Sequence, residues 1–595
     1  MPTYNYSDRR SVVYNPNRRA REQQQRSKSQ SKPQGKPQSK HSGGSLKRIL
    51  GYTLVGFVAL NIIGAVFFNN TYRSYINAVT YKAKEFQINY RTYKVQISED
   101  LPEDFAADLQ DALDEVEYKG KKRYEFVDGN ADLQIGYGSI EDEMLVLSNQ
   151  VLLPVVNLYS LKDSTDANEL NSSSVALVTL SSYESIVTAL FPDQQIIVVE
   201  NTADIEWLDS TIAIVMMSDL TADLKLLSYE GVYYLDSFDS GSLPASLGVI
   251  ESSADDSVGR TLIGLAKQEV DVEQELTDER VLKLNMTGVT ALSRNLAFKI
   301  DASGDPAYAA TKISDFLADA DLTHTSNEVS FIDDCVPVRS MSFCSNSDYL
   351  AALDAIGLDI IELTGNHNND YGAVHNTNSI GMYKERGWSY FGGGLDSTDA
   401  AKILYKEVDG TKLAFIGYNY YDTMNGSGAL ASASRAGANS FSFEKMEADI
   451  KAAKEAGAVV IVDFQFQECY SYPASDVIFP PCYKALTSPD QVGVFRQAVE
   501  DGADIVVGTQ AHQPQTFEVY NGKTIFYGLG NLFFDQIPWI GTRQGLVLTH
   551  YFVDGKHVQT KVSTTIYDND MRPYVTEGED RELLLGLLED ARASL

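Results

Sequence analysis

The sequence predicts an α/β protein in which a single transmembrane helix is followed by two α/β domains of unequal size. Three observations lead to this prediction: an uncharged apolar segment over residues 49–68, an alternation of short apolar runs with amphipathic patterns over 94–278, and a second such alternation over 281–568. Short apolar runs that alternate with helical patterns are typical of sheets covered by helices. At 595 residues the chain is also too long for a single hydrophobic core.

The first 48 residues are predicted to be a disordered basic arm, because they carry 12 Lys or Arg against two acidic residues and show no apolar periodicity. Residues 49–68 contain no charge and match the ~30 Å hydrocarbon core of a bilayer. We expect an uncleaved anchor, since a secretory signal has a shorter apolar region and a small-residue cleavage site. The positive-inside rule places the arm in the cytoplasm. The juxtamembrane stalk (69–93) and all later residues would then lie outside the cytoplasm, with the chain in the cell membrane as a single-pass protein.

Charge limits the partners of the predicted ectodomain. The formal net charge is −33 and the arm contributes +10, so the remainder carries −43. A surface of this sign argues against a nucleic-acid partner, whose phosphates must be neutralised by Lys and Arg. It also repels an anionic polymer, except at local basic or metal-containing sites.

The four cysteines form two close pairs after the apolar segment, Cys335 with Cys344 and Cys469 with Cys482. Local disulfides are expected in an oxidising compartment. Neither pair has the C-x2-C spacing typical of zinc sites. Other connectivities are formally possible, and the two local disulfides are our prediction.

Residues 94–278 are predicted to form the smaller α/β domain. Residues 154–158 and 211–215 resemble strands of extracytoplasmic solute-binding domains of the phosphate-binder type, and a spacer or partner-docking domain is the alternative. The predicted elements are strands at 93–97, 133–137, 175–180, 195–199 and 212–216 and a helix over 103–116.

Residues 281–568 are predicted to form the larger domain, a layered sheet covered on both faces, and 569–595 to form a C-terminal amphipathic helix. The predicted strands are 282–286, 360–363, 413–418, 459–464, 505–507 and 524–527, with helices over 443–456 and 490–503 between them.

Polar clusters follow the predicted strands of the larger domain, and the sharpest of them is L-T-G-N-H-N-N-D-Y over 363–371. It places Asn366, His367 and Asp370 just after a predicted buried strand, and Gly365 allows the backbone to turn sharply where that strand ends. Ligands of α/β sheets bind at the carboxyl edge, where these side chains would lie. The other clusters are T-S-N-E (325–328), D-F-Q-F-Q-E (463–468), G-T-Q-A-H-Q-P (508–514) and Y-G-L-G-N-L-F-F-D (527–535).

Taken in order, these clusters resemble the motifs of the bacterial capsule synthesis CapA family, poly-γ-glutamate capsule proteins built on a calcineurin-like metallophosphatase fold. The resemblance covers 281–568 and implies that fold for the larger domain. It matches Asn327 and Glu328, the central Asn366, His367 and Asp370, His512, and Gly530 with Asn531. Three positions depart from the family pattern: Val289 replaces a carboxylate, and Gln465 and Gln510 replace imidazoles.

These departures matter because a two-metal phosphoesterase needs carboxylate and imidazole ligands, and valine donates nothing. The resemblance implies at most one divalent metal ion, with Glu328, Asn366, His367 and His512 as its ligands, and a metal-free site is the alternative. The implied catalytic residues are His367, Asp370 as the partner that orients it, and Glu468. The implied substrate-binding residues are Asn327, Gln465, Gln510, Asn531 and Arg294.

The leading hypothesis is a membrane-anchored, extracytoplasmic protein that acts in the synthesis, export or anchoring of a capsular or cell-wall polymer. A cell-envelope polymer and other capsule-synthesis membrane proteins are the expected partners. Two alternatives stay open: a metal-dependent hydrolase of envelope polymers, and a catalytically silent polymer-binding module that has lost its metal centre.

Overall fold

The computed structural model describes residues 92–98, 101, 103–114, 116–118, 121–138, 145–238, 242–251, 280–426, 428–466, 491–536, 540–593 and 595. The predicted arm, the apolar segment 49–68 and nearly all of the stalk lie outside these residues. Within the described part of the chain, no helix has the length and apolar character needed to cross a membrane. Tyr90–Leu595 forms one compact unit.

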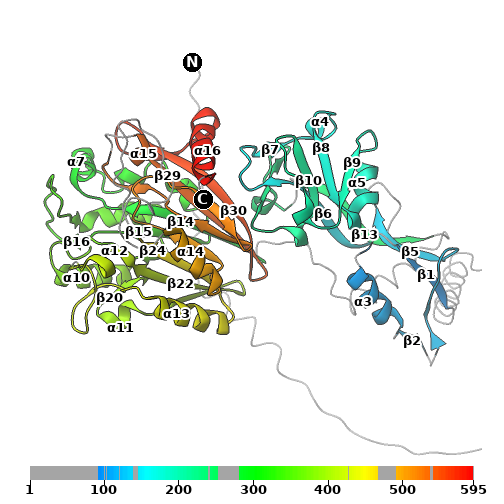
Figure 1. The fold of residues 1–595 in the computed structure, drawn as a ribbon, viewed down its shortest axis with the longest axis horizontal. Coiled ribbons are helices and arrows are strands. Elements are labelled where there is room, and N and C mark those ends of the chain that lie inside the picture. Colours follow the sequence, from blue (N-terminus) through cyan, green and yellow to red (C-terminus); the bar gives the residue numbers. More distant parts are fainter. Residues whose placement is uncertain are drawn as a thin grey trace, which may run out of the picture. The chain divides into compact units, whose positions relative to one another are not determined.

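The larger α/β region contains two β-sheets that pack face to face (Figure 1). In the first sheet β14, β15, β18 and β19 run parallel, and β29, β30 and β31 add antiparallel neighbours. Its strand order is β19 (Ser389–Phe391), β18 (Ile360–Glu362), β15 (Leu322–Asn327), β14 (Val281–Thr290), β29 (Gln544–Val553), β30 (Lys556–Tyr567) and β31 (Pro573–Val575), with β28 (Asn531–Phe533) also paired to β14.

The second sheet has four parallel central strands and an antiparallel strand at each edge. Its order is β21 (Leu404–Val408), β22 (Thr411–Asn419), β24 (Val459–Gln465), β25 (Ile505–Gly508), β27 (Lys523–Phe526) and β26 (Phe517–Tyr520). All six strands predicted from the sequence over 281–568 are present. They fall into two sheets rather than one, because apolar runs locate strands but do not specify which strands pair.

Each sheet is buried on both faces, which explains why its central strands are apolar without alternation. In β22, Leu413 and Phe415 belong to the core between the sheets, whereas Ala414 and Ile416 pack in the outer core. Helices α13 (Phe443–Glu455) and α14 (Gln491–Glu500) contribute to that outer core. Helices α7 (Arg294–Ser303), α9 (Leu350–Ala355) and α10 (Ala373–Glu385) cover the first sheet in the same way.

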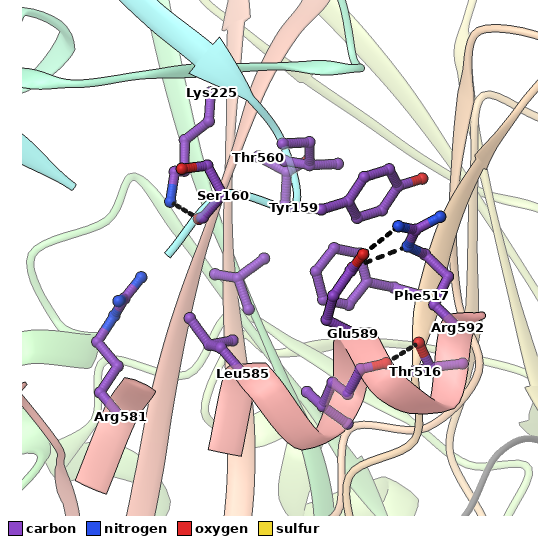
Figure 2. Close-up of a pocket in the computed structure, with 13 residues that line it drawn as sticks. Tyr159, Ser160, Lys225, Thr516, Phe517, Thr560, Arg581, Leu585, Glu589 and Arg592 are labelled. Carbon is purple, nitrogen blue, oxygen red and sulfur yellow. Dashed lines mark hydrogen bonds and ion pairs between the residues drawn. The ribbon is translucent and has the colours of Figure 1, made fainter. Parts of the chain in front are cut away.

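The C-terminal helix α16 (Gly578–Arg592) packs against the sandwich and is shorter than the helix predicted over 569–595, because Pro573–Val575 form strand β31. Its Leu584 and Leu588 are part of the core between the sheets. The Leu588 carbonyl accepts a hydrogen bond from Thr516 Oγ1 at 2.7 Å, and Glu589 pairs with Arg592 on the next turn (Figure 2). The helix therefore belongs structurally to the larger region.

The smaller region contains the predicted strands β1 (Tyr93–Ile97), β5 (Leu133–Gly138), β8 (Ala176–Leu180), β9 (Ile196–Val199) and β10 (Thr211–Met216), and the helix α3 (Glu103–Asp114). The strand-like run at 154–158 is the end of a much longer strand, β6 (Leu145–Asn157), and β13 (Leu243–Glu251) was not predicted. They pair antiparallel with each other and join the other strands in the order β4-β1-β5-β13-β6-β10-β8-β9, where β4 is Tyr124–Phe126.

Two glycines allow the strand ends of the larger region to approach closely. A Cβ on Gly365 would lie 2.5 Å from Glu328 Cα, and a Cβ on Gly288 would lie 2.0 Å from the Gly530 carbonyl oxygen. Any larger residue would push these backbones apart. The glycines thus bring together the segments that carry Glu328, His367 and Asn531.

Candidate functional site

The polar clusters meet at the carboxyl ends of the parallel strands, as predicted. Thr290 at the end of β14 pairs with Asn327 at the end of β15, and Val289 pairs with Asn531 of β28. In the second sheet Asn419 pairs with Gln465 at the ends of β22 and β24. Strand register therefore places residues from distant parts of the sequence at one edge.

His367 and Asp370 form a hydrogen-bonded pair at this edge. His367 Nδ1 lies 2.7 Å from Asp370 Oδ2, and the backbone N–H of Phe343 donates to the same oxygen at 2.8 Å. The Phe343 ring packs on the imidazole with centroids 4.2 Å apart. Since a carboxylate only accepts hydrogen bonds, this contact places a proton on His367 Nδ1 and directs Nε2 away from Asp370. The two side chains are 18% and 17% exposed, so a ligand can reach them.

His512 is held in a comparable way, but by an amide. Its Nδ1 lies 2.9 Å from Asn531 Oδ1, while Asn531 Nδ2 donates to the His512 and Thr542 carbonyls at 3.0 Å each. The Phe534 ring stacks on the imidazole at 4.9 Å. Asn531, which the family resemblance assigns to substrate binding, is thus engaged in orienting His512.

Arg294 connects the two histidine environments. Its guanidinium lies 5.0 Å from the Phe343 ring centroid and 4.9 Å from that of Phe534, distances typical of cation–π contacts. Arg294 Nε also donates to Asp535 Oδ1 at 2.7 Å, and the Asp535 carboxylate is almost completely buried. Arg294 has a left-handed backbone with φ of 51°, which these contacts hold in place.

Side-chain amides form the other side of the site. The Gln465 amide hydrogen-bonds the Gln510 amide and lies 3.0 Å from the backbone nitrogen of Asn366. It also lies 3.1 Å from Asn419 Oδ1 and 3.2 Å from the Thr364 carbonyl. Asn419 Nδ2 in turn donates to that carbonyl at 2.8 Å. The two glutamines that replace family imidazoles therefore contact each other.

These contacts form one continuous chain around the edge of the sandwich. It passes from His512 through the rings of Phe534 and Phe343 to His367, and then from Asn366 through Gln465 to Gln510. The hydrogen-bonding side chains in this series of contacts are imidazoles and neutral amides; His367 is partly exposed, whereas His512, Gln465 and Gln510 are buried. Such groups bind carboxylate, amide or hydroxyl groups without contributing fixed negative charge.

A second, fully buried polar cluster lies between the sheets. His324 Nε2 is 3.2 Å from Asp463 Oδ2, and both side chains are 0% exposed. Glu362 accepts a hydrogen bond from Thr364 N at 2.7 Å. Burial, and then the nearby Asp463 carboxylate, raise the pKa of Glu362 to about 7. Burial also raises the pKa of Asp463.

The remaining predicted site residues are found in several environments. Asn327 is buried, and its Nδ2 donates to the Val329 carbonyl at 2.7 Å and to Tyr383 Oη at 3.3 Å. Glu328 is buried beside Gly365, and Val289 is completely buried. Glu468 lies outside the described residues.

The structure does not reproduce the implied metal-ligand group. Among the residues that the structure describes, no three His, Cys, Asp or Glu side chains are grouped so that they could hold a metal ion, so Glu328, His367 and His512 do not form such a group. The amide pair of Gln465 and Gln510, together with the apolar Val289, further lacks the charged donors of a two-metal centre. The residues present therefore do not fit a dinuclear site.

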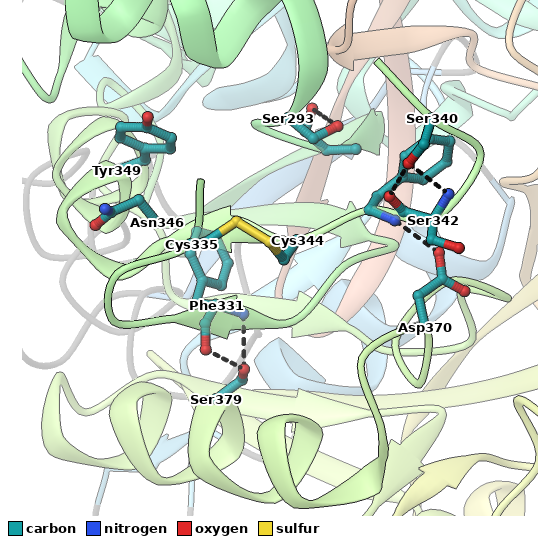
Figure 3. Close-up of a disulfide and its surroundings, with 12 residues drawn as sticks. Ser293, Phe331, Cys335, Ser340, Ser342, Cys344, Asn346, Tyr349, Asp370 and Ser379 are labelled. Carbon is teal, nitrogen blue, oxygen red and sulfur yellow. Dashed lines mark hydrogen bonds between the residues drawn. A yellow bond between two sulfur atoms is a disulfide. The ribbon is translucent and has the colours of Figure 1, made fainter. Parts of the chain in front are cut away.

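One predicted disulfide is confirmed and lies close to the site. Cys335 is bonded to Cys344, the residue after Phe343. Figure 3 shows Asp370 beside the loop that this bond closes. Cys469 and Cys482 lie outside the described residues, so the second disulfide stays a prediction.

Asn419 and the cluster of Glu362 with Asp463 were not predicted from the sequence. Asn419 lies in an aromatic run, Y-N-Y-Y (418–421), which is typical of packing. Its position at the end of a predicted strand was the available indication. His324 contacts the Phe391 ring as well as Asp463.

The fold and the site together define a two-sheet α/β sandwich with a set of polar residues at its carboxyl edge. Residues 283–536 match the model of the bacterial capsule synthesis protein family PGA_cap. This part of the chain is therefore similar to that family, whereas the rest of the chain lies outside the match.

Individual relatives agree with the family match. The capsule biosynthesis protein CapA of Bacillus anthracis is 28% identical over 248 residues, which are 41% of this chain and 56% of the relative. The PGA biosynthesis protein CapA of Bacillus subtilis is 27% identical over 208 residues, which are 35% of this chain and 50% of the relative. The chain therefore spans about half the length of the curated relatives that it matches.

A solved ABC-type phosphate transport receptor from Vibrio cholerae aligns with 30% of this chain and 94% of its own, at 13% identity and a TM-score of 0.23. A score this low does not establish a shared fold. The solute-binding resemblance over 94–278 therefore stays a prediction.

Proposed function

We propose that this protein binds a capsular or cell-wall polymer of the poly-γ-glutamate kind outside the cytoplasm and acts in its synthesis, export or anchoring. The similarity of residues 283–536 to a capsule synthesis family, and the names of the relatives as capsule biosynthesis and PGA biosynthesis proteins, support this process. Other capsule-synthesis membrane proteins are the partners that this role requires.

One observation carries the proposal: the contact chain at the carboxyl edge joins two oriented imidazoles to a pair of neutral amides. A poly-γ-glutamate segment offers amide groups along its backbone and one carboxylate on each residue. Imidazole and primary amide groups hydrogen-bond to both, and their rotamers here are fixed by packing and by Asp370 and Asn531. Preorganised donors reduce the entropy that binding must otherwise offset.

Calorimetric titration of the purified full chain with oligo-γ-glutamate tests this proposal. We expect binding that weakens roughly tenfold in His367→Ala and in Gln510→Ala, since each removes a hydrogen bond at the contact. His375→Ala is the matched control, because His375 is a partly exposed histidine on the adjacent helix α10. Equal affinity in all of these variants, or no binding by the wild type to any envelope polymer, would contradict the proposal.

A second candidate function, a metal-dependent hydrolase of envelope polymers, is favoured by the pairing of His367 with Asp370. A carboxylate that orients an imidazole is a usual companion of metal ligands and of general acid–base residues. The hydrolase would use one divalent ion with His367 among its ligands. Metal analysis of the purified chain, with His367→Ala beside it, tests this role. Absence of stoichiometric metal and hydrolysis that is indifferent to the substitution would reject it.

The proposed location is the cell membrane, with the arm in the cytoplasm and 69–595 outside. The uncharged segment 49–68 and its basic flank support this topology. Protease treatment of intact cells should then digest the part of the chain after the segment and spare the arm. Protection of the whole chain would contradict the topology.

A further inference from the structure

A cavity of about 710 Å³ lies at the other ends of the parallel strands of the second sheet, opposite to the ends that carry the carboxyl-edge residues. Val459 is the first residue of β24, Asp504 directly precedes β25, and Lys523 begins β27. Together with Lys454 and Lys556 they line one wall of the cavity. Residues 202–203 and 220–223 of the smaller region line the other wall.

Two lysines on the first wall are fixed by a buried carboxylate. Lys454 Nζ lies 2.7 Å from Asp504 Oδ2, and Lys523 Nζ lies 2.7 Å from Asp504 Oδ1. The backbone N–H of Val460 also donates to Asp504 Oδ2 at 2.9 Å. These groups hold the pKa of Asp504 below its ordinary value although burial opposes them, so the carboxylate stays ionised at neutral pH. Each ammonium group has three donors, and the contact with Asp504 uses one of them.

Lys556 adds a third positive charge to this wall. Within the described part of the chain no ion pair is formed by its side chain, which is exposed. His557 beside it contributes no charge at neutral pH, because burial lowers its pKa to about 4. The wall therefore carries three ammonium groups and one carboxylate. The other wall carries Asp223, whose Oδ1 accepts from Thr221 Oγ1 at 2.6 Å.

A net positive cavity is unusual in a protein whose formal charge is −33. Surface lysines in ordinary ion pairs stabilise a fold by at most a small amount; Lys556 forms no such pair among the described residues, although its charge helps to lower the pKa of the nearby Asp554 carboxyl. Walls of low dielectric around like charges concentrate the field and attract ligands of the opposite sign. We infer that this cavity is a second binding site, which takes a short oligoanion by its carboxylate or phosphate groups.

The identity of the oligoanion as a polymer segment rests on the proposed function. The charges on the wall do not distinguish carboxylates from phosphates, so the experiment includes both. Oligo-γ-glutamate represents the polymer and inorganic pyrophosphate represents a phosphate source. Both are titrated into the purified full chain at low ionic strength, where exposed charges are least screened.

The decisive variant is Lys556→Glu, because it reverses the charge of an exposed residue and leaves the buried Asp504 contacts intact. Its matched control is Lys451→Glu, the same change at an exposed position of the same helix as Lys454 but outside the cavity. We expect Lys556→Glu to weaken oligoanion binding roughly tenfold and Lys556→Gln to weaken it less, with little change in Lys451→Glu. Raising the salt concentration should reduce the difference between them.

The outcomes separate this site from the carboxyl-edge site. Binding of oligo-γ-glutamate that depends on Gln510 but is equal in Lys556→Glu and Lys451→Glu overturns the second site and leaves the proposed function standing. Binding of pyrophosphate alone that depends on Lys556 supports the second site and counts against the proposed polymer. Failure of the wild type to bind either anion overturns the second site.

Discussion

The larger region contains two histidine–aspartate pairs, and they differ in almost every respect except their chemistry. His367 and Asp370 lie three residues apart in one loop, partly exposed at the edge of the sandwich, with nitrogen and oxygen 2.7 Å apart. His324 and Asp463 come from different sheets, are completely buried, and lie 3.2 Å apart. The same two side chains thus form an accessible site in one place and an interior contact in the other.

The comparison shows that the role of an ionisable pair depends on its burial rather than on its residue types. Water can reach the partly exposed edge pair, whereas the interior pair has only its partner and neighbouring dipoles. We therefore expect the edge pair to control ligand binding and the interior pair to control stability and its pH dependence.

The largest expected effect comes from the same substitution in the two pairs. His324→Ala should lower the free energy of unfolding by about 3–5 kcal/mol, because it leaves a cavity and removes the partner of a buried carboxylate. His367→Ala should lower it by about 1 kcal/mol or less, since a partly exposed pair is stabilised mainly by solvent. Urea denaturation followed by circular dichroism measures both. Equal losses would contradict the division between the pairs.

The second prediction concerns Glu362, which lies near Asp463 in the interior cluster. Its folded pKa is raised to about 7, above the unfolded value, so the folded state holds a proton that the unfolded state has released. Stability should be greatest below pH 4.5 for this group, and should fall by up to about 3 kcal/mol as the pH rises to 7 and above.

Glu362→Gln should remove this part of the pH dependence, because the amide keeps the shape and does not titrate. The control is Glu385→Gln at an exposed position of α10, which should retain the wild-type profile. The free energy of unfolding is measured by urea titration between pH 4.5 and 8. An unchanged slope in Glu362→Gln would show that the interior cluster does not couple to folding.

Much of the fold could be predicted from the sequence because strand positions follow from local patterns. The predicted runs at 413–418 and 459–464 correspond to β22 and β24, since apolar residues mark strands that are buried on both faces. The division into two sheets depends on long-range pairing, such as that of β14 with β29, in which Val281 pairs with Val553. Local periodicity contains no information about such pairing.

The site was predictable to the extent that a motif occupies one loop. His367 and Asp370 are three residues apart, and their contact is confirmed. Contacts across the fold could not be predicted in this way. The link from Arg294 to Phe343 and Phe534, and the pairing of Gln465 with Gln510, bring together residues from separate segments that only the packed sandwich places side by side.

The third prediction sharpens the comparison through the loop that covers the edge pair. Replacing Cys335 and Cys344 with alanine opens a loop with a sequence separation of 9 and should lower the free energy of unfolding by roughly 2–3 kcal/mol. Because Phe343 contacts both His367 and Asp370, oligo-γ-glutamate binding should weaken as well. The double variant is compared with wild type by denaturation and by calorimetry. A loss of stability with unchanged affinity would restrict the disulfide to a structural role.

The smallest expected effect on stability comes from Asp370→Asn. The asparagine carbonyl oxygen can still accept from Phe343 N, so the free energy of unfolding should change by about 1 kcal/mol or less. The substitution removes the negative charge that favours the Nδ1–H form of His367, however, and ligand binding should weaken more than stability does. Asp370→Ala, which removes both hydrogen bonds, should weaken binding further. If Asp370→Asn binds the ligand as the wild type does while Asp370→Ala does not, Asp370 acts only by accepting hydrogen bonds, and its negative charge is not required for ligand binding.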